Sequence, residues 1–329
     1  MSRPITLVSG QWADLPFGEF CAKAGSMGFD GVEIACWGDH MDVRAAATDQ
    51  AYIADRKRIL EGNGLGCWAL SAHLAGQCIG DRWDPRLDNF APPSVKGNPE
   101  AIVAWATEEM KLTARAAKNM GCRVVTCFMG SPIWGYWYSF PQTGEDLVAK
   151  GYAEIVRRWS PIFDEFDACG VRFALEVHPA EIAFDYYTAK RLLEAFDYRP
   201  TLGFNFDPSH LLWQGVKPDL FIRDFADRIY HVHMKDVAVR PDGRAGILGS
   251  HLPFGDLRRG WNFVSIGRGD VDFDAIIREL NVAGYAGPLS VEWEDAGMHR
   301  ERGASESLEY VRRIDFDTSD RAFDAAMER

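Results

Sequence analysis

Four residue positions with metal-binding or acid–base side chains follow one another through the second half of the chain. Glu176, Asp207, His233 and Glu292 each stand at or near the end of a short, mostly apolar run. A single residue of this kind is ordinary as a helix cap, an ion-pair partner or a hydrogen-bonded core histidine. Four at equivalent positions are harder to explain in that way, because clustered buried carboxylates need a compensating charge. The pattern predicts that these four side chains bind one divalent metal ion.

The types of donor atom restrict which metal ions can bind and which reaction the site can catalyse. One imidazole and three carboxylates favour Mn²⁺, with Mg²⁺, Co²⁺ and Zn²⁺ as alternatives. Such an ion on a hydroxy-carbonyl unit would acidify the neighbouring C–H and stabilise a metal-bound enediolate. Glu176 and Glu292, on opposite sides of the ion, would then exchange a proton with the substrate carbon. We therefore expect proton abstraction next to a carbonyl.

Further candidates surround these four positions. His73 and His210 are candidate acid–base groups, although a loop histidine explains His73 equally well. Lys235 is a candidate substrate contact or proton donor, or else an ion-pair partner of its neighbour Asp236. Aromatic residues concentrate in the 133–140 loop, where sugar faces and flat aglycones would stack, unless the loop is a lid or a subunit contact. The expected substrate-binding residues are His178, Lys235, Arg268, Trp37, Gln77, Trp134 and Trp137. Arg268 would bind an anionic group, or else it is an exposed residue in a tight Gly-Arg-Gly turn.

The elements that must position these residues form a repeating pattern. Amphipathic segments end at glycine, the usual residue just past a helix, and short apolar runs typical of buried parallel strands follow. The expected helices include 17–27, 50–62, 99–120, 146–169, 218–225, 273–283 and 304–313, with a long glycine-rich loop between 234 and 273. The expected strands are 5–8, 31–34, 67–73, 123–128, 172–177, 201–206, 229–234 and 289–292.

Eight such units predict an α/β fold, a (β/α)8 TIM barrel, whose chemistry lies at the carboxyl ends of the strands. A doubly wound open sheet is the alternative, but the first strand is followed by Gly10 without a G-x-G-x-x-G motif. We find no linker, so we expect one domain over 1–329, with 315–329 as a surface tail.

Composition excludes several other classes of protein. The net charge of −12 over 329 residues argues against a nucleic-acid partner, because phosphate backbones require a basic surplus. No apolar run is long enough to cross a membrane, and no signal peptide is evident. The seven cysteines are scattered without a C-x-x-C motif, which favours a cytoplasmic location.

Several segments resemble the xylose isomerase-like TIM-barrel superfamily, also called the sugar phosphate isomerase/epimerase family. They are GFDGVEI (28–34), ALEVHP (174–179), FDPSH (206–210), HVHMKD (231–236), IGRGDVDF (266–273) and LSVEWED (289–295). The resemblance implies that Glu176, Asp207, His233 and Glu292 bind a divalent metal, and that Glu176 and Glu292 are the acid–base pair. It also implies that His210 contacts substrate or a second metal.

The branch within the superfamily stays open at this point. The first expectation is a metal-dependent sugar or keto-sugar isomerase or epimerase, although epimerases of free ketoses carry an arginine where this chain has Lys235-Asp236. The alternative is a lyase, either an inosose dehydratase or a 3-oxo-C-glycoside deglycosidase, the latter with a separate small subunit. A metal-dependent sugar-binding protein comes third. In each case we expect a small carbohydrate or glycoside ligand and a homo-oligomer.

Overall fold

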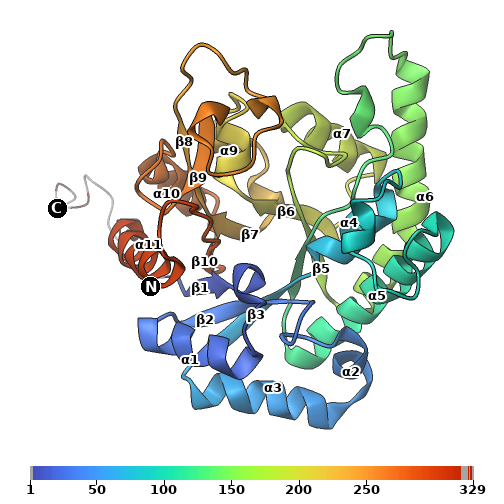
Figure 1. Ribbon diagram of the computed structural model, residues 1–329. Coiled ribbons are helices and arrows are strands. Elements are labelled where there is room, and N and C mark those ends of the chain that lie inside the picture. Colours follow the sequence, from blue (N-terminus) through green and yellow to red (C-terminus); the bar gives the residue numbers. More distant parts are fainter. Residues whose placement is uncertain (1–2, 320–324, 326, 328–329) are drawn as a thin grey trace.

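Eight parallel strands close into a barrel in the computed structural model, which describes residues 3–319, 325 and 327 (Figure 1). Their order around the barrel is β1-β10-β7-β6-β5-β4-β3-β2. The strands are β1 (Ile5–Val8), β2 (Gly31–Ala35), β3 (Gly66–Ser71), β4 (Val124–Cys127), β5 (Arg172–Glu176), β6 (Leu202–Phe206), β7 (Ile229–Met234) and β10 (Leu289–Val291). The expected (β/α)8 fold is confirmed, with strand bounds within two residues of those expected.

Helices surround this barrel and connect its strands (Figure 1). Gly28, Gly121 and Gly170 end α1, α5 and α6 with positive φ angles of 92°, 87° and 68°, as the helix–glycine pattern predicted. The helices are α1 (Phe17–Met27), α2 (Val43–Thr48), α3 (Gln50–Gly62), α4 (His73–Gly80), α5 (Pro99–Met120), α6 (Glu145–Cys169), α7 (Tyr186–Ala195), α8 (Pro208–Leu212), α9 (Pro218–Asp224), α10 (Phe273–Val282) and α11 (Arg300–Ile314).

The segment between β7 and α10 differs from the expected loop. It contains an antiparallel hairpin of β8 (Asp236–Val239) and β9 (Trp261–Val264). The Trp261 ring stacks on Trp213 with centroids 4.3 Å apart, which fastens the hairpin to the segment after α8. Asp236 accepts hydrogen bonds from the amides of Gly267 and Gly269 at 2.9 and 2.8 Å. These contacts hold the Gly-Arg-Gly turn at 267–269 in place.

A group of aromatic residues packs in the core between the barrel and helix α6. Trp159, Phe163 and Phe173 are fully buried and pack together, with ring centroids 4.9 to 5.7 Å apart. No helix within the described residues is long and apolar enough to span a membrane. The expected tail begins with a docked residue, because Asp315 accepts a hydrogen bond from the Arg3 amide at 2.9 Å. Residues 320–324, 326, 328 and 329 of that tail lie outside the described residues.

Candidate metal centre and active site

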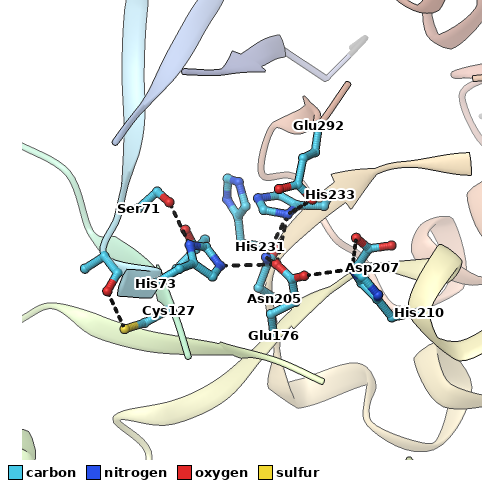
Figure 2. A network of polar contacts seen from close by, with 12 residues as sticks. Ser71, His73, Cys127, Glu176, Asn205, Asp207, His210, His231, His233 and Glu292 are labelled. Carbon is cyan, nitrogen blue, oxygen red and sulfur yellow. Dashed lines mark hydrogen bonds and ion pairs between the residues drawn. The ribbon is translucent and has the colours of Figure 1, made fainter. Parts of the chain in front are cut away.

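The four predicted metal-binding side chains converge at the carboxyl end of the barrel (Figure 2). Glu176 ends β5, Asp207 follows β6, His233 lies in β7 and Glu292 follows β10. One potential ligand atom from each lies within 4.8 Å of those of the other three. Nδ1 of His233 lies 3.2 Å from Oε2 of Glu176 and 3.2 Å from Oε2 of Glu292. We call these four residues the acidic cluster.

The acidic cluster fits a divalent cation. Oδ1 of Asp207 accepts hydrogen bonds from the amide and hydroxyl of Ser209 at 2.8 and 2.7 Å. Its buried Oδ2 has no hydrogen-bond partner among the described residues, and the nearest basic atoms, Nε2 of His210 and Nζ of Lys235, lie 3.5 and 3.9 Å away. Burial raises the pKa of Asp207 to about 6, against the opposing charges of His210 and Lys235. A buried carboxylate oxygen without a donor is costly unless a cation approaches it. The described residues therefore include a buried group that can hold a metal ion.

A further carboxylate, outside the acidic cluster, contacts His233 from inside the barrel. Glu33 on β2 places both carboxylate oxygens 3.1 Å from Nε2 of His233, and Oε2 also lies 2.7 Å from Nε2 of His231. Thr126 and Ser290 donate hydroxyl hydrogen bonds to Glu33 at 2.6 and 2.8 Å. Burial would raise the pKa of Glu33, but the two histidines hold it well below its usual range. Glu33 is thus an ionised carboxylate held entirely within the protein.

This arrangement prepares His233 as a ligand. In a neutral ring, donation from Nε2 to Glu33 leaves the lone pair of Nδ1 facing the acidic cluster. The side-chain amide of Asn205 supports this tautomer, because its Nδ2 lies 3.1 Å from Nδ1 and 3.0 Å from Oε2 of Glu176. The sequence analysis assigned no role to Glu33, His231 or Asn205. The feature that could have identified them is that each is a polar residue within a parallel strand of otherwise apolar residues.

A lysine closes the other side of the acidic cluster. Nζ of Lys235 lies 3.0 Å from Oε2 of Glu292, 3.3 Å from Glu294 and 3.4 Å from Nε2 of His210. Burial would lower the pKa of Lys235, but these acids raise it well above its usual range. The expected alternative, an ion pair with Asp236, is not what the structure contains, because that carboxylate binds backbone amides.

Three histidines lie on the Glu176 side. Nε2 of His210 is 3.3 Å from Oε1 of Glu176, and Nε2 of His73 is 3.2 Å from Oε2 (Figure 2). The other ring nitrogen of His73 lies 2.7 Å from the hydroxyl of Ser71. The ring of His178 packs 4.1 Å from that of His210, and its buried Nδ1 has no hydrogen-bond partner among the described residues. The structure therefore places His73, His210 and His178 around Glu176, where the sequence analysis expected acid–base and substrate groups.

Other expected substrate contacts lie elsewhere. Arg268 is exposed and pairs with Glu306 at 2.6 Å, on the outside of α11. Trp134 packs edge to face on Phe184 with centroids 5.3 Å apart, and Trp137 is 50% exposed. Both tryptophans line a cavity of about 190 Å³ between the 133–140 loop and α6 and α7, rather than the acidic cluster. Their roles as substrate contacts therefore stay predictions, and these contacts lie away from the acidic cluster.

The two remaining expected substrate contacts are Gln77 and Trp37. Gln77 is buried on α4 and lines a groove together with His178. The Trp37 ring lies against Gly10. A Cβ at position 10 would come within 2.9 Å of this ring, so the contact requires glycine there. The sequence analysis missed Gln11, whose Nε2 lies 3.1 Å from Oε1 of Glu292 and 3.3 Å from Glu294. No motif distinguishes Gln11 in the sequence, because only the turn after β1 brings it to the strand ends.

A family model described as a xylose isomerase-like TIM barrel matches residues 21–314, so the chain belongs to this family. The chain is 26% identical to the uncharacterized protein YfiH of Bacillus subtilis (strain 168), over 94% of this chain and 98% of that protein. It is 30% identical to the inosose dehydratase of Geobacillus kaustophilus (strain HTA426), over 60% of this chain and 64% of that enzyme.

Solved structures share the fold. The 3-keto-D-glucoside 4-epimerase YcjR from E. coli superposes with a TM-score of 0.67 at 15% sequence identity, covering 94% of this chain and 99% of that one. At this identity the likeness establishes the barrel architecture and leaves the reaction to be argued from the site.

Proposed function

We propose that this protein is a divalent-metal-dependent enzyme that isomerises or epimerises a sugar or keto-sugar by abstracting a proton next to its carbonyl. One observation carries the proposal: Glu176 and Glu292 approach Nδ1 of His233 at the same distance, 3.2 Å, from two different strands. Two carboxylates that flank one ligand position can act on two sides of a bound substrate. The similarity to an inosose dehydratase supports an enzyme with a sugar-like substrate and is equally consistent with the second candidate below.

Mn²⁺ is the ion that the donor set favours, held by Glu176, Asp207, His233 and Glu292, and when bound it would polarise the substrate carbonyl and acidify the adjacent C–H. The protein supplies the proton transfers. A proton taken by Glu176 can pass to His210 at 3.3 Å or His73 at 3.2 Å. Burial would raise the pKa of Glu292, but the Lys235 ammonium, 3.0 Å away, and His233 lower it, which keeps this carboxylate ionised and able to accept a proton. Each carboxylate is thus backed by a basic side chain.

A lyase is the second candidate, and Lys235 favours it. The ammonium faces the acidic cluster rather than solvent, so it can donate a proton to a group leaving the β carbon. The same initial proton abstraction would then end in elimination, as in an inosose dehydratase or a 3-oxo-C-glycoside deglycosidase. The latter reading includes a separate small subunit as partner. A metal-dependent sugar-binding protein is the least favoured candidate, because pure binding does not require two flanking bases.

Proton exchange in D₂O tests the proposal. The Mn²⁺-loaded protein is incubated with ketoses, 3-oxo-glycosides and inososes, and deuterium incorporation is followed by NMR and mass spectrometry. We expect exchange at a carbon next to the carbonyl, and a loss of at least about 100-fold in Glu176→Gln. Release of water or an aglycone selects the lyase. Binding without any exchange across the panel would leave the sugar-binding protein as the better account.

The metal assignment has its own test. Elemental analysis is expected to find about one divalent ion per chain, lost in Asp207→Asn and kept in Glu61→Gln, an exposed glutamate on α3. A full metal complement in Asp207→Asn would contradict the ligand set. The expected cytoplasmic location, single domain and homo-oligomer stay predictions, and sedimentation velocity tests the last of them.

A further inference from the structure

A groove opens beside the acidic cluster on the side of Glu176. Its volume is about 310 Å³, and residues of the loop after α4, the end of β4 and the loop after β5 line it. Leu87, Phe90, Phe128 and Ala180 supply its apolar surface. This is enough space for one ring beyond the sugar carbons that would sit at the metal.

The inner end of the groove is in contact with the proposed catalytic groups. The ring of Phe128 lies 4.5 Å from that of His73 and 4.8 Å from that of His178. His73 contacts Glu176 directly, and the His178 ring packs on His210, which also contacts Glu176. A substrate that reaches the acidic cluster along this groove therefore passes Phe128 and leaves its remote part in the groove.

The charged residues of the groove are already paired within the protein. Nε of Arg86 donates to Oδ1 of Asp84 at 2.9 Å, and the pair is largely exposed. Oδ1 of Asp81 accepts from the amide of Ser131 at 2.8 Å. Two carboxylates against one guanidinium leave a negative balance, which disfavours a phosphate or carboxylate on the ligand. Apart from His178 and Gln77, the rest of the lining is apolar, so an uncharged ring fits it best.

We propose that this groove is a subsite for an uncharged, ring-bearing substituent of the substrate. This inference rests on the proposed function. The substrates would then be glycosides with an apolar aglycone rather than free ketoses or sugar phosphates. The sequence analysis expected the 133–140 loop to contact such a ring. The groove takes over that role because it, and not the cavity under Trp134, adjoins the histidines around Glu176.

Equilibrium binding separates this subsite from the reaction itself. Phenyl 3-oxo-β-D-glucoside and methyl 3-oxo-β-D-glucoside are titrated calorimetrically into the Mn²⁺-loaded protein. The two probes share the sugar and differ in the group that the groove would hold. We expect the phenyl probe to bind at least about tenfold more tightly, as burial of one ring predicts. Equal affinities, or no binding of the phenyl probe, would overturn the subsite.

Variants locate the preference within the groove. Phe90→Ala removes a partly exposed ring and Leu87→Asp places a charge on the apolar wall, so both are expected to reduce the phenyl-to-methyl affinity ratio to within about twofold of one. Phe140→Ala, on an exposed ring outside the groove, is the matched control and should keep the ratio. Loss of the ratio in the control alone would move the subsite to the 133–140 loop and contradict the proposal.

Two results distinguish the subsite from the proposed function. A retained phenyl preference without deuterium exchange in either probe would refute the proposed reaction and leave the subsite supported. Deuterium exchange in the methyl probe without a phenyl preference would support the proposed reaction and refute the subsite. D-fructose 6-phosphate serves as the anionic probe, and tighter binding of this compound than of the phenyl glycoside also overturns the subsite.

Discussion

Glu33 places both of its carboxylate oxygens 3.1 Å from Nε2 of His233. The histidine of the acidic cluster is therefore contacted, on the side away from the cluster, by an acid from across the barrel. The two residues come from β2 and β7, which are not neighbours in the sheet. This contact orients the imidazole and keeps its proton on the nitrogen that faces away from the cluster.

Replacement of Glu33 is therefore expected to act on the metal without touching it. Glu33→Gln should weaken Mn²⁺ binding about 10- to 100-fold, as loss of a carboxylate behind a histidine ligand typically does. Calorimetric titration of the metal-free protein measures the change, with Glu61→Gln as the exposed control. Unchanged affinity in a folded Glu33→Gln protein would show that the contact is structural only.

Metal removal should destabilise the whole barrel. The acidic cluster joins four strands, and without an ion the positive charge that compensates its carboxylates comes from Lys235 and the neighbouring histidines. Bound metal at about 100 times its Kd adds about 2.7 kcal/mol to the free energy of unfolding. A chelator should lower the thermal midpoint of the natural protein by several degrees and leave that of Asp207→Asn unchanged. An equal shift in both proteins would point to a different metal site.

Lys235 allows the two candidate reactions to be separated. Lys235→Met removes the ammonium that lies 3.0 Å from Glu292 and 4.4 Å from the centroid of the Phe263 ring, but keeps an unbranched apolar side chain of similar length. If the chain is a lyase, the variant should retain deuterium exchange and lose release of the leaving group by at least about 100-fold. If it is an epimerase that reprotonates through Glu292, exchange and product formation should fall together. Lys190→Met, on the outer helix α7, is the control.

Glu181 should make stability depend on pH. Its Oε2 accepts the amides of Met129 and Gly130, both at 2.7 Å, yet burial raises its pKa well above the usual range. The folded chain therefore retains a proton that the unfolded chain releases above about pH 4.3, so this group lowers stability as pH rises beyond that value. The effect is at most about 1.4 kcal/mol per pH unit.

Glu181→Gln removes this titration while keeping an acceptor for the two amides. We expect its thermal midpoint to exceed that of the natural protein at pH 8 and to approach it at pH 5. Melting curves at both pH values measure the difference, and an advantage that is the same at pH 5 and pH 8 would contradict the assignment.

The packing of α4 makes a further prediction. A Cβ at Gly76 would lie 2.1 Å from the carbonyl oxygen of Phe128 and 2.3 Å from Sγ of Cys127. Gly76→Ala should therefore push α4 away from β4, displace Gln77 and His73, and cost about 1–3 kcal/mol of stability. Gly18→Ala, on α1 with open space around it, should be neutral or slightly stabilising by denaturant unfolding. Comparable stability of the two variants would contradict the close approach.

The sequence by itself determined the barrel and the residues of the acidic cluster. Short apolar runs alternating with glycine-terminated helices are local patterns, and in a parallel barrel every strand end faces the same way. The position of Glu176, Asp207, His233 and Glu292 at strand ends was therefore sufficient to predict that they converge, and the structure brings them together.

Only the tertiary structure decided what surrounds that cluster. Oε1 of Glu33 lies 3.1 Å from Nε2 of His233, but the two residues are far apart in the chain, so no local spacing predicts their contact. Arg268 and Trp134 carry suitable chemistry, yet the turn held by Asp236 directs the first to Glu306, and the 133–140 loop packs the second against Phe184. Side-chain direction in loops depends on such long-range contacts, whereas direction at the end of a barrel strand follows from the fold.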